Sequence, residues 1–156
     1  MTWRNYLIQY WRSYHLFILS FVAIVIFLVA IFFIFFAPRQ VPVMAGNCSF
    51  TAKLALTARE QYRGLSGRKN ISTQEGMLFI FTDVADKTFV MREMNFPLDI
   101  IFIRDHKVVN LYRNLLPEGK QPQFSYPSGS PVDAVLEIPG GQSQHCRLGV
   151  GSAITW

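Results

Sequence analysis

The longest uniform pattern in the chain is an apolar run from Leu16 to Ala37, in which Ser20 is the only polar side chain. At about 1.5 Å per residue, a helix of this length reaches roughly 33 Å, and the hydrocarbon core of a bilayer is about 30 Å thick. The run therefore predicts a single transmembrane helix over residues 16–37. A buried helix of a soluble protein fits less well, because so small a chain cannot cover a helix that is apolar on every side.

A cleaved signal peptide is the alternative interpretation of this run, because Val43, Met44 and Ala45 resemble the small residues of a cleavage site. The run exceeds the usual apolar core of about 7 to 15 residues, and Pro42 falls inside the site. We therefore expect the segment to be retained as a signal anchor, with cleavage as the open alternative.

The segment before the run, residues 1–15, carries aromatic and apolar side chains at helical spacing: Trp3, Leu7, Tyr10 and Tyr14. This pattern predicts a helix in the cytoplasmic interface of the membrane. Arg4 and Arg12 precede the run, whereas only Arg39 follows it closely. Because positive charge favours the cytoplasmic side, we expect a cytoplasmic N-terminus and an extracytoplasmic C-terminal domain, either periplasmic or at the cell surface.

Beyond the run, the pattern changes to short segments typical of β structure. Pro38, Pro42 and Gly46 predict a linker over residues 38–47, which leaves residues 48–156 for a domain. Alternating or apolar segments predict strands at residues 50–56, 77–81, 88–94, 98–104, 107–112, 132–138 and 152–156. Several connections are too short for parallel crossovers, so most neighbouring strands are expected to be antiparallel.

Helical signals in this domain are few. Thr57 and Glu60 match a capping box and Gly64 supplies a stop, which predicts a helix over residues 58–63. A helical turn is expected over residues 142–147, and residues 114–131 predict a long surface loop. The fold class is therefore mainly β: a compact antiparallel β barrel or sandwich with one or two short helices, preceded by a single transmembrane helix.

Charge and cysteine content narrow the function classes. The net charge of +5 divides into +2 for residues 1–37 and +3 for the rest, where basic residues are scattered among acidic ones, which argues against a nucleic-acid surface. Cys48 and Cys146 are expected to form a disulfide in an oxidising compartment, with two free thiols as the alternative. No ligand-spaced histidine and cysteine cluster is present, so neither a metal site nor a cofactor is predicted.

Five ordered blocks of residues resemble the family known as domain of unknown function 192: Arg63–Arg68, Gly76–Phe81, Phe89–Arg92, Phe96–Ile103 and Val135–Gly141. The resemblance covers about residues 50 to 156. It implies a compact β-rich domain, commonly exported or tethered behind one hydrophobic N-terminal segment. It implies no reaction.

Charged residues in these blocks form the candidate site. Asp99 shares a predicted strand face with Ile101 and Ile103, so its carboxylate is expected at the edge of the apolar interior, where a charge needs a partner. The candidate partners are Arg63, Arg68 and Arg92. This arrangement predicts either a recessed site for a small polar ligand or a structural ion pair.

Three further residues join the candidates. Glu93 is a second candidate acid or base beside Asp99, or else a solvated residue. Glu137 is either an outward residue of its strand or a ligand contact, and Met91 is expected to pack rather than to bind a soft metal. The predicted ligand-binding set is Arg63, Arg68, Met91, Arg92, Asp99 and Glu137.

Taken together, the sequence predicts a membrane-anchored, extracytoplasmic β module that binds a partner. The partner is either a small ligand or a membrane protein complex in which the chain is an accessory subunit, and residues 16–37 contact the lipid bilayer. The alternative is a small envelope hydrolase or transferase that uses Asp99 or Glu93 with Arg92 or Arg63. Binding is favoured over catalysis because Ser66 lacks the pentapeptide of a nucleophile elbow.

Overall fold

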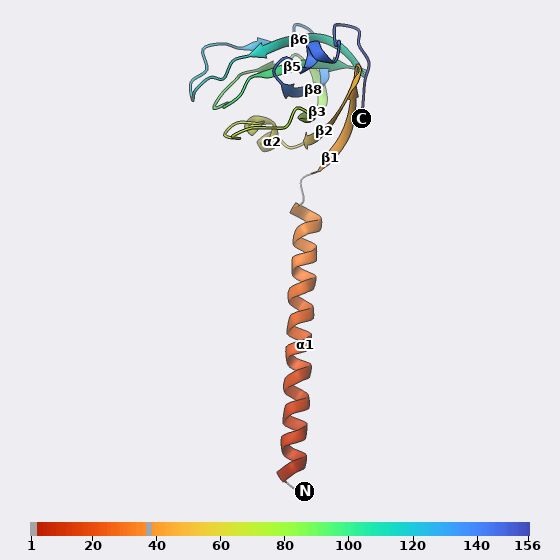
Figure 1. Cartoon of the computed structure of the whole chain (residues 1–156), viewed down its shortest axis with the longest axis vertical. Coiled ribbons are helices and arrows are strands. Elements are labelled where there is room, and N and C mark those ends of the chain that lie inside the picture. Colours follow the sequence, from red (N-terminus) through yellow and green to blue (C-terminus); the bar gives the residue numbers. More distant parts are fainter. Residues whose placement is uncertain (1–2, 37–38) are drawn as a thin grey trace. The chain divides into compact units, whose positions relative to one another are not determined.

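The computed structural model describes the backbone of residues 3–36 and 39–156, and the side chains of residue 15, residues 17–32 and residues 39–156. The chain divides into two compact units, Met1–Pro38 and Arg39–Trp156. The first unit holds helix α1, Trp3–Phe36 (Figure 1). Among the residues with described side chains, no helix combines the length and hydropathy needed to cross a membrane. The aromatic face predicted for residues 1–14 and the end of the predicted span, residues 33–37, lie outside those side chains.

The second unit is mainly β, with seven strands in one curled sheet of order β6-β5-β8-β3-β2-β1-β9 (Figure 1). The strands of this sheet are β1 Gln40–Ala45, β2 Cys48–Ala55, β3 Glu75–Ala85, β5 Leu98–Arg104, β6 Lys107–Leu115, β8 Val132–Pro139 and β9 Ile154–Thr155. A two-stranded ribbon pairs β4, Thr88–Phe89, with β7, Tyr126–Pro127. The helices are α2, Ala58–Arg63, and α3, Gln142–His145. The predicted mainly β class is confirmed.

One strand pair departs from the antiparallel pattern. β2 pairs with β3 in parallel, from Thr51 opposite Glu75 to Ala55 opposite Phe79. Residues 56–74 connect the two strands, which is long enough for a crossover, and they carry α2. The crossover brings α2 next to β2 and β3, where Gln61 Nε2 donates hydrogen bonds to the carbonyls of Ala55 and Ile80.

The central strands are buried on both faces. In β5, Ile101 packs in one core and Phe102 in the other, and β3 alternates in the same way through Leu78 and Phe79. We call these the disulfide-side face, which includes Ile101 and Cys146, and the cavity-side face, which includes Phe102 and Phe79. Apolar runs with little alternation are typical of strands covered on both sides. A polar side chain in such a strand is therefore buried on either face.

Part of the predicted linker is wrong, because residues 40–45 form β1. Val43 and Ala45 are buried while Pro42 and Met44 are exposed, which is the period of a half-buried strand. β9 pairs only with Met44 and Ala45, so Pro42 lies where that side of the strand is unpaired. Proline is tolerated at such an edge, because no N–H is needed there.

The strand predicted over residues 88–94 is also wrong beyond Phe89, since β4 ends there and Arg92 forms only an isolated bridge, to Glu118. Glu93 has a φ of 51°, in the left-handed region, so the backbone turns there. Leu98–Arg104 and Ala58–Arg63, in contrast, have the predicted bounds. Arg92, directly before this turn, lies beside α2, where its guanidinium donates to the carbonyl of Tyr62.

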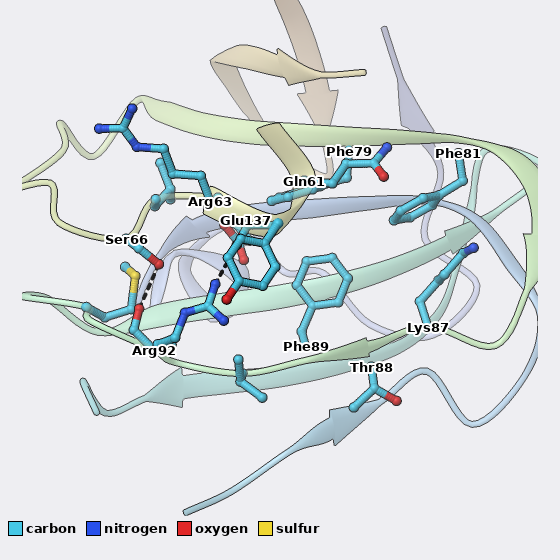
Figure 2. A pocket seen from close by; sticks show the side chains of 15 residues that line it. Gln61, Arg63, Ser66, Phe79, Phe81, Lys87, Thr88, Phe89, Arg92 and Glu137 are labelled. Carbon is cyan, nitrogen blue, oxygen red and sulfur yellow. Dashed lines mark hydrogen bonds between the residues drawn. The ribbon is translucent and has the colours of Figure 1, made fainter. Parts of the chain in front are cut away.

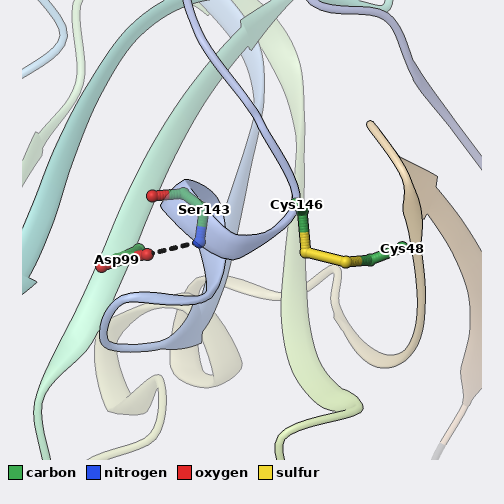
Figure 3. Close-up of a disulfide and its surroundings, with 4 residues drawn as sticks. All are labelled: Cys48, Asp99, Ser143 and Cys146. Carbon is green, nitrogen blue, oxygen red and sulfur yellow. Dashed lines mark hydrogen bonds between the residues drawn. A yellow bond between two sulfur atoms is a disulfide. The ribbon is translucent and has the colours of Figure 1, made fainter.

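A disulfide joins Cys48, the first residue of β2, to Cys146, which follows α3 (Figure 3). The two Cα atoms are 5.4 Å apart and the residues are 98 positions apart in the chain. The predicted pairing is confirmed, and the alternative of two free thiols is wrong. The bond closes a loop that contains α2, β3, β5 and β8.

Candidate functional site

A cavity of about 320 Å³ lies against the cavity-side face, and we call it the aromatic cavity (Figure 2). Its lining residues come from α2 and the turn after it, from β3 and β8, and from the segment around β4. They are Gln61, Tyr62, Arg63, Gly64, Leu65, Ser66, Phe79, Phe81, Lys87, Thr88, Phe89, Val90, Arg92, Met94 and Glu137. The volume falls at the lower end of the range of about 300–1,000 Å³ typical of small-molecule sites.

Helix α2 forms one wall of this cavity, and local sequence fixes where it begins. Thr57 Oγ1 accepts from the N–H of Glu60, while Glu60 Oε2 accepts from the N–H of Thr57, which completes the predicted capping box. The carboxylate of Glu60 accepts hydrogen bonds from the Thr57 N–H, the Thr57 hydroxyl and the Leu56 N–H, and these bonds lower the pKa of Glu60. Gln61 then ties the helix to β2 and β3. The capping box and this tie together position the wall.

Arg92 is held against the last turn of α2. One of its guanidinium nitrogens donates to the carbonyl of Tyr62 at 2.6 Å, and the guanidinium lies 4.0 Å from the centre of the Tyr62 ring. Ser66 Oγ donates to the carbonyl of Arg92 at 2.7 Å, and Gly67 N–H donates to that of Glu93. The guanidinium is thus oriented by contacts that use few of its five N–H donors.

Glu137 lies in β8 between Met77 of β3 and Ile100 of β5, on the cavity-side face. Its side chain is only 5% exposed, and its Oε2 atom has no hydrogen-bond partner among the described residues. Burial raises the pKa of Glu137 to about 8, so the carboxyl group is mainly neutral at pH 7. Of the two interpretations left open for Glu137, the outward orientation is wrong, because β8 is covered on both faces.

Phenyl rings form the apolar wall beside Glu137. Phe79 and Phe89 meet edge to face with ring centres 5.0 Å apart. The ammonium of Lys87 lies 4.5 Å from the centre of the Phe81 ring and is paired with Asp83 at 2.9 Å. Figure 2 shows Arg92 and Lys87 at opposite ends of the view with Phe89 between them. The two ends therefore differ, since only the Lys87 end carries a paired cation.

Three of the six predicted ligand-binding residues line the aromatic cavity: Arg63, Arg92 and Glu137. Met91 is fully buried in the core on the cavity-side face, as its packing interpretation requires. Arg68 is exposed, and its carbonyl accepts a hydrogen bond from Asn95 Nδ2. Neither Arg68 nor Met91 contributes to the cavity lining.

The expectation that an arginine neutralises Asp99 is wrong. Asp99 is fully buried in β5 opposite Ile138, on the disulfide-side face, so the sheet separates it from Arg63 and Arg92. Its carboxylate instead accepts three backbone N–H bonds, from Asn114 at 2.6 Å, Gly141 at 2.9 Å and Ser143 at 2.7 Å. Figure 3 shows the bond from Ser143. Two of these donors lie at the start of α3, so Asp99 caps that helix from a distant strand.

Glu93 lies apart from Asp99, at an exposed position beside α2. It lines a second cavity, of about 560 Å³, together with Arg59, Tyr62, Arg63, Ser66, Arg92 and Lys120. Of the two candidate acids or bases, Glu93 therefore shares a cavity with Arg92 and Arg63, whereas Asp99 does not. Within the described part of the chain, no group of three or more histidine, cysteine or acidic residues is arranged to hold a metal ion.

The sequence pattern missed the aromatic wall and the burial of Glu137. Phe79 and Phe81 are two residues apart in β3, which places them on one face of a strand, but they read as ordinary core residues. The available signal was the run Ala134 to Ile138, in which Glu137 is the only polar residue. Because almost every residue of this run is apolar, it indicates a strand that is buried on both faces. A glutamate in such a strand faces the interior whichever way its side chain points.

Two solved structures share this fold. A protein of unknown function from Novosphingobium aromaticivorans has a TM-score of 0.72 and 33% identity, and the match covers 78% of this chain and 88% of that one. A proposed transcription regulator from Sinorhizobium meliloti has a TM-score of 0.71 and 23% identity, over 76% and 94% of the two chains. A comparison with curated proteins finds no match. Residues 41–156 match DUF192, described as uncharacterised ACR, and the chain therefore belongs to this family.

Proposed function

We propose that this chain is a membrane-anchored, extracytoplasmic β module that binds a small ligand in the aromatic cavity. The observation that carries the binding function is Glu137, which lines the aromatic cavity and whose buried Oε2 lacks a hydrogen-bond partner among the described residues. Buried polar groups are normally paired, so an unpaired one beside a cavity suits a ligand that supplies the partner. With its pKa raised to about 8 by burial, the carboxyl group offers a hydrogen-bond donor at pH 7.

The surroundings of Glu137 also suit a ligand. Gly64 has a φ of 50°, and a Cβ there would stand 3.6 Å from Phe79 and 3.8 Å from Glu137 Oε2. Glycine thus provides the left-handed turn and keeps the space beside the carboxyl group open. The rings of Phe79 and Phe89 offer an apolar wall next to it. A ligand with an aromatic or aliphatic body and one hydrogen-bond acceptor matches this combination.

The anchor and the location rest on sequence. The apolar run from Leu16 to Ala37 extends beyond the described side chains at both ends, and α1 is helical over Trp3–Phe36. A helix with that sequence is long enough to span the hydrocarbon core. The disulfide supports an oxidising compartment for the β unit, because such bonds persist there.

Methionine methyl groups provide the test of ligand binding. Met94 lines the aromatic cavity, whereas Met44 lies on β1 and does not. We expect neutral, anionic and cationic aromatic fragments, screened against the full chain in lipid nanodiscs, to include some that shift the ¹³C-methyl resonance of Met94 and leave Met44 unchanged. The proposed function is wrong if no fragment of any charge shifts Met94.

Substitutions at Glu137 separate a specific contact from simple exclusion of water. Glu137→Gln keeps a hydrogen-bond donor of the same size, whereas Glu137→Leu removes it. Fragments with a carbonyl acceptor should bind to the Gln variant about as well as to the wild type, and about tenfold more weakly to the Leu variant. Equal binding of these fragments to both variants would show that Glu137 does not contact the ligand.

A further inference from the structure

The second cavity, which we call the cationic recess, adjoins the aromatic cavity. The two share Tyr62, Arg63, Ser66 and Arg92 among their lining residues. Arg92 stands at the junction, where its contacts with Tyr62 fix the guanidinium. A molecule longer than the aromatic cavity would therefore pass Arg92 and enter the recess.

The recess carries an excess of positive charge. Arg59, Arg63, Arg92 and Lys120 line it, and Glu93 is the only acidic lining residue. In the part of the chain that the structure describes, none of these four cations forms an ion pair. Four cations from α2, the segment after β4 and the loop after β6 thus converge on a recess with one acidic residue and no ion pair among the described residues, which favours a bound anion.

The opposite end of the aromatic cavity lacks this property. Lys87 is already neutralised by Asp83, and its ammonium is placed over the Phe81 ring. Between the two ends the wall is formed by Phe79, Phe81 and Phe89. The combined site is therefore apolar along its length, and at one end, the end with Arg92, it has cations that form no ion pair among the described residues.

We propose that the two cavities together bind an amphipathic anion, with its apolar part among Phe79, Phe81 and Phe89 and its anionic head group against Arg92 in the cationic recess. The proposal rests on the proposed function and adds the class of ligand. The guanidinium of Arg92 can form paired hydrogen bonds to a carboxylate or phosphate head group while it remains stacked on Tyr62. Arg59, Arg63 and Lys120 add electrostatic attraction.

Three probes of the same shape and different charge test this class: 4-phenylbutyrate, 4-phenylbutyramide and 4-phenylbutylamine. Binding is measured by calorimetry with the full chain in phosphatidylcholine nanodiscs, and empty nanodiscs correct for partition into lipid. We expect the carboxylate to bind about tenfold more tightly than the amide. The amine should bind more weakly than the amide. The affinity of the carboxylate should fall as salt is raised, because the contact is electrostatic.

Variants locate the anionic contact. Arg92→Met should weaken 4-phenylbutyrate about tenfold and leave the amide unchanged, while Lys107→Met, at an exposed lysine outside both cavities, should change neither. Because Arg92 also contacts Tyr62, the double variant Arg59→Met with Lys120→Met gives a second test that leaves the capping box, the Gln61 hydrogen bonds and the Arg92 contact of α2 in place. It should weaken only the carboxylate, by several-fold.

The outcomes separate this inference from the proposed function. If the amide or the amine binds in the aromatic cavity as tightly as the carboxylate, the cavity is a ligand site but the anionic class is wrong. If none of the three shifts the Met94 methyl while other fragments of the screen do, the amphipathic anion is the wrong class; if no fragment of any charge shifts it, the binding function itself fails. Competition by phosphatidylglycerol in the nanodisc would identify a lipid as the source of the anion, and its absence would identify a soluble one.

Discussion

Glu137 and Asp99 are buried carboxyl groups on the neighbouring strands β8 and β5, and their surroundings differ because they face opposite sides of the sheet. Asp99 accepts three backbone N–H bonds and so satisfies the start of α3. The buried Oε2 of Glu137 has no hydrogen-bond partner among the described residues, and the side chain lines a cavity. In the pairing of β5 with β8, Asp99 lies opposite Ile138 and Glu137 lies opposite Ile100, one position away. Because successive side chains point to opposite faces, this single step places one carboxyl group in a structural role and the other in the candidate ligand site.

The raised pKa of Glu137 predicts how stability depends on pH. Its ordinary pKa of 4.5 is raised by burial to about 8 in the folded chain. Above pH 4.5 the unfolded chain releases a proton that the folded chain retains, so the free energy of unfolding falls by up to about 1.4 kcal/mol per pH unit until about pH 8. Glu137→Gln removes this loss, so its stability relative to wild type should rise across that window.

Urea denaturation of the full chain at several pH values between about 5 and 8 measures this difference. The charged groups that face Glu137 across the cavity are Arg63, Lys87 and Arg92, whereas its neighbours on β3 and β5, Met77 and Ile100, carry no charge. Glu93→Gln, at an exposed glutamate, is the matched control. Parallel pH profiles for wild type and Glu137→Gln would contradict the buried, neutral carboxyl group.

Asp99→Ala should destabilise the fold. The N–H groups of Asn114, Gly141 and Ser143 would lose their acceptor, and a buried donor without a partner costs about 1–3 kcal/mol. We expect a loss of about 3 kcal/mol or more, measured from the denaturation midpoint. Asp86→Ala, at an exposed aspartate, should change stability little. Unchanged stability of Asp99→Ala would mean that the cap is dispensable.

At the scale of elements, the cavity depends on α2, a helix of six residues that is too short to be stable alone. Its position comes from the Thr57 and Glu60 capping box, from Gln61 and from the stacked Arg92. These contacts join the helix to β2, β3 and the segment after β4. Loss of any one of these contacts should therefore loosen α2 and with it this wall of the cavity.

Thr57→Ala should weaken both the helix and the site. Loss of the N-cap hydroxyl costs about 1 kcal/mol, because the N–H of Glu60 loses its acceptor. We expect that loss in the free energy of unfolding and a weaker shift of the Met94 methyl in the fragment screen. Thr73→Ala, at an exposed threonine, serves as the control. Equal stability of the two variants would show that packing alone places α2.

Sequence predicted elements whose ends carry local signals and missed those that depend on distant partners. Helix 58–63 was predictable because Thr57, Glu60 and Gly64 mark its ends. β1 was missed because Pro42 suggested a linker, and only the pairing with β2 and the short β9 shows why proline is tolerated there. The orientation of Glu137 likewise depends on what covers each face of β8, which alternation within a single strand does not reveal.

At the scale of the whole molecule, the disulfide between Cys48 and Cys146 encloses every residue of both cavities in one loop. β1 and β9 lie outside this loop and pair with each other. The bond therefore restrains the unfolded chain over the portion that forms the site. The free cation cluster and the apolar cavity lie within that restrained portion.

Replacing both cysteines by serine should lower the free energy of unfolding by up to about 4.7 kcal/mol, the value expected for a loop of roughly 100 residues in the chain-entropy model. Chemical denaturation of wild type and the double variant, each with and without reductant, measures the difference. Reductant should destabilise only the wild type. Equal stability of the oxidised wild type and the double variant would show that the bond adds nothing to the fold.

The proposed topology makes the last prediction. Arg4 and Arg12 flank the apolar run on one side against Arg39 on the other, so the β unit should lie outside the cytoplasm. If a reporter that works only outside the cytoplasm is fused after Trp156, the fusion should be active. Thiol reagents should label Cys48 and Cys146 only after reduction. The two readouts depend on different properties, one on translocation and the other on the redox compartment. An inactive reporter together with direct thiol labelling would reverse the topology, and it would leave the anionic ligand to be sought among cytoplasmic molecules.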